Sequence, residues 1–445
     1  MKYIVKTIQG IASAYLAYPI AERLEKRHIR RKLRELRRHY ALPFAVRRKL
    51  AQEQLASALS YAGHQVPYYH DLFSTHGIDP DNIRKDIRYL LDIPFLTKDI
   101  IREQGDRLLS QPLTEVRHHA CKTGGSTGLS CVIHYDQEAA DYSAAVTLYA
   151  RERIGKLKRK TELHFACRFP DAVPSRWPTC EDYKCFAMNR SNIFFDRIDS
   201  IGLEEIWQTL LARRPYLVHA HPSTIYALAR HIEQSCGTGK TFEVFESSGE
   251  LLEPYQREAI ARILQCRVIN RYGLAELGVM AYEVDGHDGG LQVFDSEGWP
   301  EYLPVGTDDH DGHELVFTGF RNKLMPLIRY RTGDSAMVEE RENGFSLTNV
   351  IGRIHDLVPI NGIDHATHYI QDMLDHRVGG IQEFQIDLRT TPPTLKIVPE
   401  PSANQEHIRN RIEQFWGNGF NFQFCSHDDF VRVGRHAKFR HVVHP

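Results

Sequence analysis

The sequence lacks several patterns that would assign it to a class at once. Its eight cysteines contain no Cys-x-x-Cys pair and its 24 histidines no His-Glu-x-x-His spacing, so neither pattern of zinc site is indicated. Its 56 basic and 57 acidic residues give a formal net charge of −1, which provides no overall field for nucleic acid. The cysteines are those expected of reduced thiols in a cytoplasmic protein.

A long apolar run is also missing. The most apolar stretch, residues 3–20, contains Lys6 and Gln9 and is short for a membrane span. A basic cluster follows this stretch, whereas a signal peptide places its basic residues first. Two interpretations remain for residues 1–40. They form either an amphipathic helix packed on the body or in a homodimer, or a helix lying on the anionic inner face of the membrane.

A complete Walker A loop is absent, although Cys236–Thr241 (CGTGKT) resembles the end of one. That motif requires glycine at position 234, where the chain has glutamine, and it requires a strand before the loop and a helix after it. Here a helical pattern precedes the segment and the strand-like TFEVF follows it. The sequence therefore predicts a turn between a helix and a strand.

An alternation of strands and helices is present instead. At 445 residues the chain is too long for one ordinary core, so we expect two or more domains. Residues 20–60 are predicted to be helical. From residue 115 the runs TELHFAC, YLVHAH, TFEVFES and CRVINRYG alternate with helical stretches, which predicts an α/β body with largely parallel strands. Short strands and turns follow residue 280, and the tail is long enough for a small α+β domain.

Two polar motifs are candidates for binding a nucleotide. In the turn after Lys122, small residues let backbone N–H groups approach an anion, although such a turn alone is usually only a turn. Ser248–Glu250 and Tyr272–Glu276 follow two strand-like runs, and loops that leave neighbouring parallel strands converge on one crevice. A carboxylate such as Glu276 could hold the Mg²⁺ that accompanies ATP there, although alone it would be read as a helix cap.

Three further motifs complete the series. Asp334 ends the buried-looking run MPLIRYRTGD and is suited to accept hydrogen bonds from ribose hydroxyls. Arg353 and Asp356 stand at the expected domain junction. Lys438 lies in a terminal basic run, which is ordinarily a solvated surface. Each signal is weak alone, and only their order and spacing together are informative.

In this order the motifs resemble those of the adenylate-forming superfamily. The segments VPYYHDLF, GIDP and LLDIPFLTKDIIRE resemble the branch of phenylacetate–CoA ligases and capsular-polysaccharide-biosynthesis ligases, and the resemblance covers nearly the whole chain. It implies a large α/β N-terminal domain, with parallel-rich sheets and a small β-barrel-like part, and a small mobile α+β C-terminal domain. The implied boundaries are 1–45 for a basic helical segment, 46–352 for the large domain and 353–445 for the lid.

The resemblance implies that one group of residues contacts ATP. The glycine-rich loop would wrap the phosphates, and the next two motifs would border the adenine and stack near it. Asp334 would bind the ribose hydroxyls, and Arg353 would contact the ribose or a phosphate. These residues are Thr123, Gly124, Gly125, Ser126, Thr127, Gly128, Ser248, Gly249, Glu250, Tyr272, Gly273, Asp334 and Arg353.

Catalysis is implied for three residues. Lys438 would contact the carboxylate and the α-phosphate, Glu276 would ligate Mg²⁺, and Thr127 would act from the loop. The C-terminal domain would rotate between adenylation and acyl transfer about a hinge at His355 and Asp356. The histidine occupies the usual position of a hinge carboxylate, which departs from the pattern of the family.

The carboxylate pocket of such enzymes would lie between the second and third strands of the body. Its lining would come from residues 164–169 and 218–226, with Phe245 and Gly273 nearby. His219 and His221 stand two apart on a strand-like run and should share one face. They either recognise a polar substrate group or pack among aromatic residues. The neighbouring phenylalanine and tyrosine residues favour an aryl or mid-sized acid.

The implied reaction joins a small carboxylic acid to ATP and then passes the acyl group to coenzyme A. An amine or a carrier-protein thiol is the alternative acceptor, and a non-catalytic nucleotide-binding relative is the alternative class. Some members of the branch carry a zinc site after the Tyr-Gly…Glu motif. Because no cysteine lies between residues 277 and 424, we expect no zinc in that region.

Overall fold

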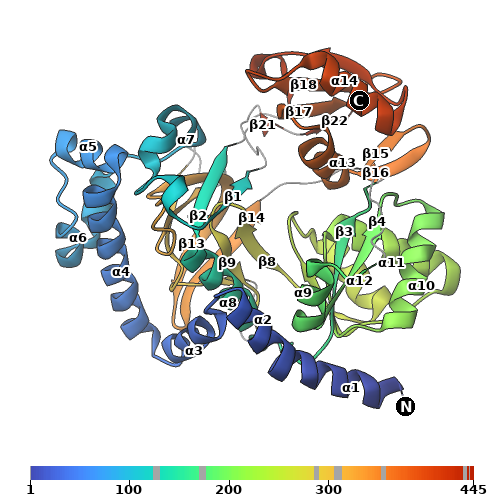
Figure 1. The fold of residues 1–445 in the computed structure, drawn as a ribbon, viewed down its shortest axis with the longest axis horizontal. Helices are drawn as coiled ribbons and strands as arrows, with labels where there is room; N and C mark the ends of the chain where they lie inside the picture. Colours follow the sequence, from blue (N-terminus) through green and yellow to red (C-terminus); the bar gives the residue numbers. More distant parts are fainter. Residues whose placement is uncertain are drawn as a thin grey trace.

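The computed structural model describes residues 2–123, 131–169, 177–284, 290–304, 313–351, 357–433, 438–439 and 441–444. Figure 1 shows helices along one side, a central body containing two large sheets, and a C-terminal part above the body. No helix in these ranges combines the length and the apolar character needed to cross a bilayer.

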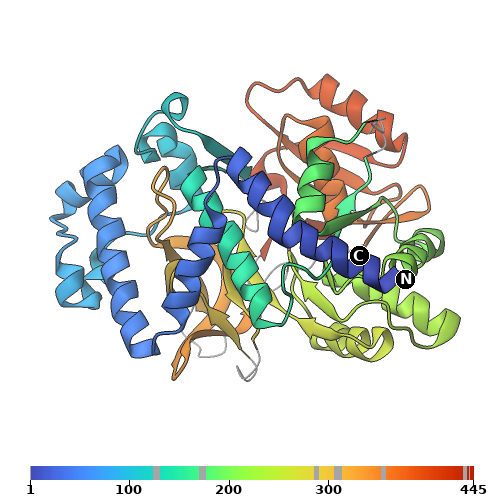
Figure 2. The ribbon, with the colours of Figure 1, turned by 60° about the horizontal axis from the view of Figure 1, so that its bottom comes forward.

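The N-terminal region is helical, as the sequence predicts. Figure 2 shows its first helices laid across the body beside α8 (Gln137–Arg153). The elements are α1 (Lys2–Ala12), the π-helical turn η1 (Ser13–Ala17), α2 (Tyr18–Leu24), α3 (Ile29–Tyr40), α4 (Phe44–Gln65), α5 (Pro67–His76), α6 (Asn82–Lys85), η2 (Ile87–Asp92), α7 (Lys98–Gln104), η3 (Gly105–Leu108) and η4 (Leu113–Glu115).

A five-stranded parallel sheet confirms the predicted α/β body. Its order is β4-β3-β5-β6-β7, and every adjacent pair is parallel. The strands are β3 (Glu162–Cys167), β4 (Arg190–Phe195), β5 (Leu217–Ala220), β6 (Val244–Ser247) and β7 (Arg267–Ile269), and the helices between them are α9 (Cys180–Met188), α10 (Ser200–Arg213), α11 (Pro222–Cys236) and α12 (Pro254–Leu264). The CGTGKT segment joins α11 to β6, which confirms that it is a turn between a helix and a strand.

A seven-stranded antiparallel sheet forms the other half of the body. Its order is β11-β12-β13-β14-β10-β9-β8, so within the described ranges it is an open sheet with β11 and β8 at its edges. The strands are β8 (Arg271–Leu274), β9 (Gly278–Tyr282), β10 (Leu291–Val293), β11 (Gly298–Pro304), β12 (His313–Gly319), β13 (Tyr330–Arg341) and β14 (Gly344–Ile351). A separate hairpin, β1 (His118–Lys122) with β2 (Val132–Asp136), lies beside it.

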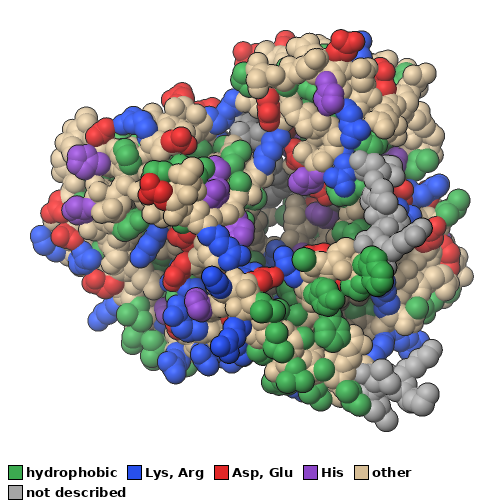
Figure 3. All heavy atoms as spheres, in the orientation of Figure 1, with side chains coloured by type: hydrophobic (Ala, Val, Ile, Leu, Met, Phe, Trp, Pro, Cys, Tyr) green, Lys and Arg blue, Asp and Glu red, His purple; other side chains and the backbone are tan. Residues whose placement is uncertain are grey.

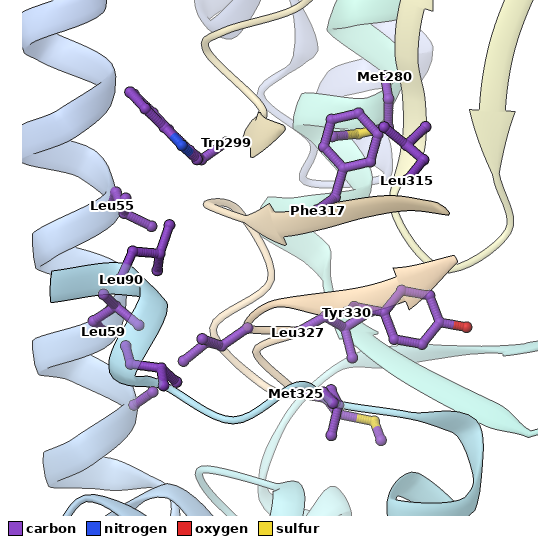
Figure 4. Close-up of a cluster of buried hydrophobic side chains, with 14 of the residues drawn as sticks. Leu55, Leu59, Leu90, Met280, Trp299, Leu315, Phe317, Met325, Leu327 and Tyr330 are labelled. Atoms are coloured by element: carbon purple, nitrogen blue, oxygen red, sulfur yellow. The ribbon is translucent and has the colours of Figure 1, made fainter. Parts of the chain in front are cut away.

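The largest hydrophobic core joins the N-terminal helices to the antiparallel sheet. Figure 4 shows Leu55 and Leu59 of α4 facing side chains such as Leu327, with Phe317 and Tyr330 deeper in the cluster. These side chains are almost fully buried. Because the cluster includes Tyr272, the packing that holds this sheet also fixes the strand on which predicted site residues lie.

The C-terminal part has its own sheet and core. The elements are β15 (Leu357–Ile360), β16 (Ile363–Ala366), α13 (Thr367–Met373), η5 (Leu374–Val378), β17 (Ile381–Asp387), β18 (Thr394–Pro399), α14 (Gln405–Trp416), β19 (Asn421–Phe424), η6 (His427–Asp429), β20 (Arg432–Val433), β21 (Lys438–Phe439) and β22 (Val442–Val443). The order β19-β18-β17-β22 defines a mixed four-stranded sheet. The predicted boundary at 352–353 lies outside the described residues.

Polar contacts join this C-terminal part to the body. The Cys167 thiol donates to Asp372 at 2.9 Å, and Lys122 lies 2.9 Å from Asp375 and donates to the Ile381 carbonyl at 2.6 Å. Burial raises the pKa of Asp372, so its carboxylate is costly to ionise at this contact. Lys122 directly precedes the glycine-rich turn, and the C-terminal part therefore contacts the hairpin that carries the turn.

Candidate active site

The chain passes from the parallel sheet to the antiparallel sheet at one residue, Asn270. Sequence reasoning placed Tyr272–Glu276 at the end of a parallel strand, but β7 ends at Ile269 and residues 271–274 form β8, which pairs with β9 in the other sheet. The prediction was wrong because the run CRVINRYG is continuous in its apolar pattern, which does not reveal a change of sheet. The crevice is consequently formed where the two sheets meet.

Six predicted nucleotide-binding and metal-binding residues line one cavity of about 200 Å³ at this junction. They come from three separate segments of the sequence: the loop after β6, β8 with the turn that follows it, and β13. The six are Gly249, Glu250, Tyr272, Gly273, Glu276 and Asp334. Ser248 directly precedes them in the chain, and its N–H donates to the carbonyl of Ala220.

Asp334 enters the cavity through a bulge in β13. It was predicted to end a strand, but β13 begins at Tyr330 and continues to Arg341. The pairing with β12 shifts across residues 331–335, and Gly333 has φ +77°, a conformation that glycine adopts without strain. A bulge of this kind re-aims a side chain, and here Asp334 accepts a hydrogen bond of 2.9 Å from the Tyr272 hydroxyl.

The Tyr272 hydroxyl is held as a donor. The side chain is buried, and its ring stacks 6.5 Å from that of Phe317. Burial and the nearby Asp334 carboxylate raise the pKa of the hydroxyl well above its ordinary value. Tyr272 therefore orients Asp334, and one consequence is that the carboxylate can present its remaining lone pairs to a ligand in the cavity.

Glu276 is held by two partners that sequence reasoning did not name. The Tyr330 hydroxyl donates to its Oε1 at 2.8 Å, and the Lys98 Nζ lies 3.7 Å from the same oxygen. Both partners are buried. Thr97 caps α7, because its hydroxyl accepts from the N–H of Ile100, and this fixes Lys98 as the first residue of the helix.

The second oxygen of Glu276 suits a hard cation. In the part of the chain that the structure describes, the hydrogen bond from Tyr330 and the nearest approach of Lys98 are both made to Oε1. No three His, Cys, Asp or Glu side chains in those ranges gather closely enough to hold a metal ion. Because Mg²⁺ is commonly held by one or two carboxylates together with phosphate oxygens and water, a single available carboxylate oxygen fits a nucleotide-bound Mg²⁺.

Gly249 and Glu250 shape the wall opposite β8. Gly249 has φ +83°, and a Cβ there would meet the ring of His221, so a side chain would push that ring out of place. The Glu250 carboxylate accepts from the N–H and the hydroxyl of Ser223 at 3.1 and 2.9 Å. It thus caps the amino end of α11, where the helix dipole favours negative charge.

The glycine-rich turn begins at a well-fixed residue. Thr123 is 1% exposed, and its hydroxyl accepts from the N–H of Cys131 at 3.0 Å, while its own N–H donates to the Cys131 carbonyl. These bonds close the hairpin at the base of the turn. The predictions for Gly124, Gly125, Ser126, Thr127 and Gly128 lie outside the described residues.

Four other predicted residues have no described side chain. Arg353, His355 and Asp356 lie outside the described ranges. The backbone of Lys438 belongs to β21, which pairs with β20 and is drawn on the side of the C-terminal part turned toward the β1–β2 hairpin (Figure 1). The roles assigned to these four residues stay predictions.

His219 lies in a buried network of charges instead of facing the cavity. Its Nδ1 is 2.8 Å from Glu246, and its ring lies 4.8 Å from that of His164. Burial lowers the pKa of His219 to about 3, so the ring is neutral. Arg151 pairs with both Glu246 and Glu162, at 2.6 and 3.2 Å.

β5 ends at Ala220, and His221 is the residue before α11, so only His219 of the two histidines lies on the strand itself. The expectation that the two histidines share one face stays a prediction. Phe245 is fully buried in the core formed by the parallel sheet and α10–α12. Contact of these three residues with a substrate stays a prediction.

A second cavity, of about 390 Å³, lies on the other side of Glu276. One wall is α8, where small side chains including Ala140, Ser143 and Ala144 leave space. The opposite wall contains Leu277 and Gly278, directly after Glu276. The two cavities therefore share the Glu276 segment, an arrangement that sequence reasoning missed because the small residues of α8 give no motif.

The chain is similar in sequence to several known proteins. No family model matches the chain. The chain is similar to a phenylacetate-coenzyme A ligase from Escherichia coli K12 (24% identity, covering 83% of this chain and 88% of that protein) and to one from Thermus thermophilus (26%, 82% and 86%). It is also similar to Protein CapK from Staphylococcus aureus (21%, 70% and 68%).

Solved structures show that the fold is shared. A 2-hydroxyisobutyryl-CoA ligase in complex with 2-HIB-AMP and CoA, in its thioesterification state, matches with a TM-score of 0.57 at 18% identity over 91% of each chain. The same enzyme in a postadenylation state matches with a TM-score of 0.56 at 17% identity over 91% of each chain. Together the relatives, the shared fold and the ordered motifs support the class of adenylate-forming ligases. Within that superfamily they support the branch similar to phenylacetate–CoA ligase.

Proposed function

We propose that the protein uses ATP and Mg²⁺ to convert a small carboxylic acid to its acyl-adenylate, and then transfers the acyl group to coenzyme A. The observation that carries this proposal is the single cavity in which Gly249, Glu250, Tyr272, Glu276 and Asp334 meet. The relatives named phenylacetate-coenzyme A ligase support the same reaction.

In this proposal the chain positions its substrates and offsets charge. Asp334, oriented by Tyr272, holds the ribose, and Gly249 lets the adenine approach the backbone without a side chain between them. Glu276, fixed by Tyr330 and Lys98, holds the cation. Mg²⁺ when bound would neutralise phosphate charge and polarise a phosphoryl oxygen. Lys438 would add a positive charge where carboxylate and α-phosphate meet, and such preorganised groups lower the barrier most.

The carboxylic acid is proposed to occupy the cavity beside α8. This cavity adjoins Glu276 on the side away from Asp334, so an acid there would face the α-phosphate of a nucleotide held at Asp334. Its size suits a small or aryl acid better than a long acyl chain. The pocket predicted around His219 would instead require the buried charge network to open.

Narrowing this cavity should weaken binding of the acid. Ala144 lines it from α8, and Ala144→Leu is expected to raise the KM for acids by about tenfold, since a leucine side chain takes the volume of several methylene groups. The KM for ATP should change little. Steady-state kinetics with each substrate varied in turn would measure both constants. An unchanged KM for every acid, with a correctly folded variant, would exclude this cavity as the acid site.

Asp334 should act mainly on nucleotide affinity. Asp334→Asn keeps an acceptor for the Tyr272 hydroxyl but loses the charge, and we expect the KM for ATP to rise about 10- to 100-fold, the cost of losing a charged hydrogen bond. Tyr272→Phe is the matched control, because it removes only the orienting bond and should have a smaller effect. An ATP KM unaffected by Asp334→Asn would contradict the ribose role.

The C-terminal part is proposed to act as a mobile lid. Support comes from its own sheet and core and from its polar contacts with the body at Asp372 and Asp375. A mixed anhydride is destroyed by water, so closing a lid over it has a clear purpose.

The acceptor is tested by product analysis. Pyrophosphate release is measured with a panel of aryl and small acids, and each reaction is supplied with coenzyme A, a carrier protein or an amine. Thioester formed with coenzyme A supports the proposal. Acyl transfer only to the amine or the carrier would support the alternative acceptor. If none of the acids causes release of pyrophosphate, only nucleotide binding would be left.

A further inference from the structure

The first helices of the chain present an apolar stripe to solvent. Large apolar side chains recur along α1, η1 and α2 on the side away from the body. Their exposed fractions are high throughout the stripe: Ile8 62%, Ile11 46%, Tyr15 65%, Leu16 64%, Ile20 58% and Leu24 79%. Single exposed apolar residues need no explanation, but a contiguous row of six is a feature of interaction sites.

The fold holds this stripe in place. Four buried residues recur at intervals of four along these helices, namely Gly10, Ala14, Tyr18 and Glu22. In a regular α-helix, residues spaced four apart would shift progressively around the helix axis. The π-helical turn at Ser13–Ala17 takes up one extra residue and keeps the four on one face. A side chain at Gly10 would collide with the Arg159 carbonyl, so the helix lies directly on the body.

A basic cluster continues the stripe onto α3. Several of its arginines are already paired with acids: Arg30 with Glu22, Arg31 with Glu35 and Arg37 with Glu152. Four exposed cations have no partner among the described residues, namely Arg23, Lys26, Arg34 and Arg38. Figure 3 shows the two features side by side, with hydrophobic side chains over α1 and α2 and blue ones over α3.

The combination points to one kind of partner. A second copy docked on the same face would cover the apolar stripe but would bring no excess of acidic side chains to the basic cluster, because both copies present the same patch. An anionic bilayer complements both features at once, since apolar side chains enter the boundary of the acyl chains while cations meet the headgroups. We propose that α1, η1, α2 and α3 form a docking surface for an anionic membrane.

The proposed docking surface and the C-terminal part lie on opposite edges of the molecule. In Figure 1, α1 to α3 run along the lower edge of the molecule, whereas the C-terminal part lies at the upper edge. A protein lying on a membrane through α1 to α3 would therefore keep its proposed lid facing water. Docking would concentrate the enzyme at the bilayer without requiring a membrane-soluble substrate.

The test is co-sedimentation of the full chain with vesicles. Vesicles of phosphatidylcholine with about one third phosphatidylglycerol should bind the protein, and vesicles of pure phosphatidylcholine should bind it at least fivefold less, since each basic residue near an anionic surface contributes about fivefold in affinity. Raising the salt concentration to 0.5 M should reduce binding to the anionic vesicles.

Two double variants test the apolar stripe and the basic cluster separately. Ile11→Glu with Leu16→Glu removes apolar contact, and Arg34→Glu with Arg38→Glu removes charge; each pair should lower vesicle binding at least tenfold. Leu91→Glu and Arg409→Glu, at exposed positions outside the surface, are the matched controls and should bind like the wild type. All four proteins should keep the wild-type melting temperature.

Three outcomes would overturn the proposal. The first is no binding of the wild type to anionic vesicles. The second is equal binding by the surface variants and their controls. The third is the finding of a dimer in place of vesicle binding. If light scattering shows a concentration-dependent dimer that Ile11→Glu with Leu16→Glu dissociates, and no vesicle binding occurs, the surface belongs to a second copy of the chain.

Discussion

Replacing Lys438 with alanine is expected to abolish adenylation while leaving the fold intact. The proposed role of this lysine is to offset the charge that builds up as a carboxylate attacks the α-phosphate. Removing one preorganised group of this kind typically costs about 10²- to 10³-fold in kcat. Pyrophosphate release at saturating ATP and acid measures the loss directly.

The control for this prediction is a second lysine of the C-terminal part. Lys396 is half-buried and donates to the backbone carbonyl of Asp429, so Lys396→Ala should leave adenylation within about twofold, as a change away from the site. Both variants should melt within a few degrees of the wild type. Adenylation by Lys438→Ala at the wild-type rate would refute the role assigned to this lysine.

Removal of Arg151 is expected to give the largest loss of stability. Arg151 is buried on α8 and pairs with Glu246 and Glu162, which are themselves buried. Burial alone would raise the pKa of each carboxyl, but Arg151 holds both pKa values well below the ordinary range, so both groups are ionised. Arg151→Met would leave buried negative charge without its main partner, at a cost of about 3–5 kcal/mol in the free energy of unfolding.

Thermal unfolding with a matched surface pair checks this value. Arg48→Met breaks an exposed ion pair with Glu340 and should cost less than about 1 kcal/mol. If Arg151→Met melts at the wild-type temperature, the network contributes no net stability.

The parallel sheet could be predicted because each of its strands is a short apolar run followed by a helix. The pattern fixed the strand assignments at Val244–Ser247 and Leu217–Ala220. It did not reveal where the chain changes sheet, since Arg267–Leu274 reads as one continuous run. The bulge that places Asp334 inside a strand was also hidden, because it depends on pairing with β12, which is a tertiary property.

Some residues of the candidate site could likewise be predicted from the sequence, and others could not. Tyr272, Glu276 and Asp334 were found because each belongs to a motif with a fixed order, and the structure brings them to one cavity. Lys98 and Tyr330, which hold Glu276, were missed because they lie 178 and 54 positions from it in the sequence, and no motif links them to it. His219 was expected at a substrate pocket. Its neighbours in the interior are Glu246 and His164, which come from adjacent strands. The sequence alone does not show which residues of adjacent strands lie side by side.

The central claim is that the protein makes acyl-adenylates, and exchange of labelled pyrophosphate into ATP tests it most directly. The wild-type protein is incubated with ATP, Mg²⁺ and single acids, with no thiol or amine present. We predict that label enters ATP only when an accepted acid is added, because the adenylate forms reversibly on the enzyme. No exchange with any acid, together with no shift of the melting temperature by ATP, would contradict the account.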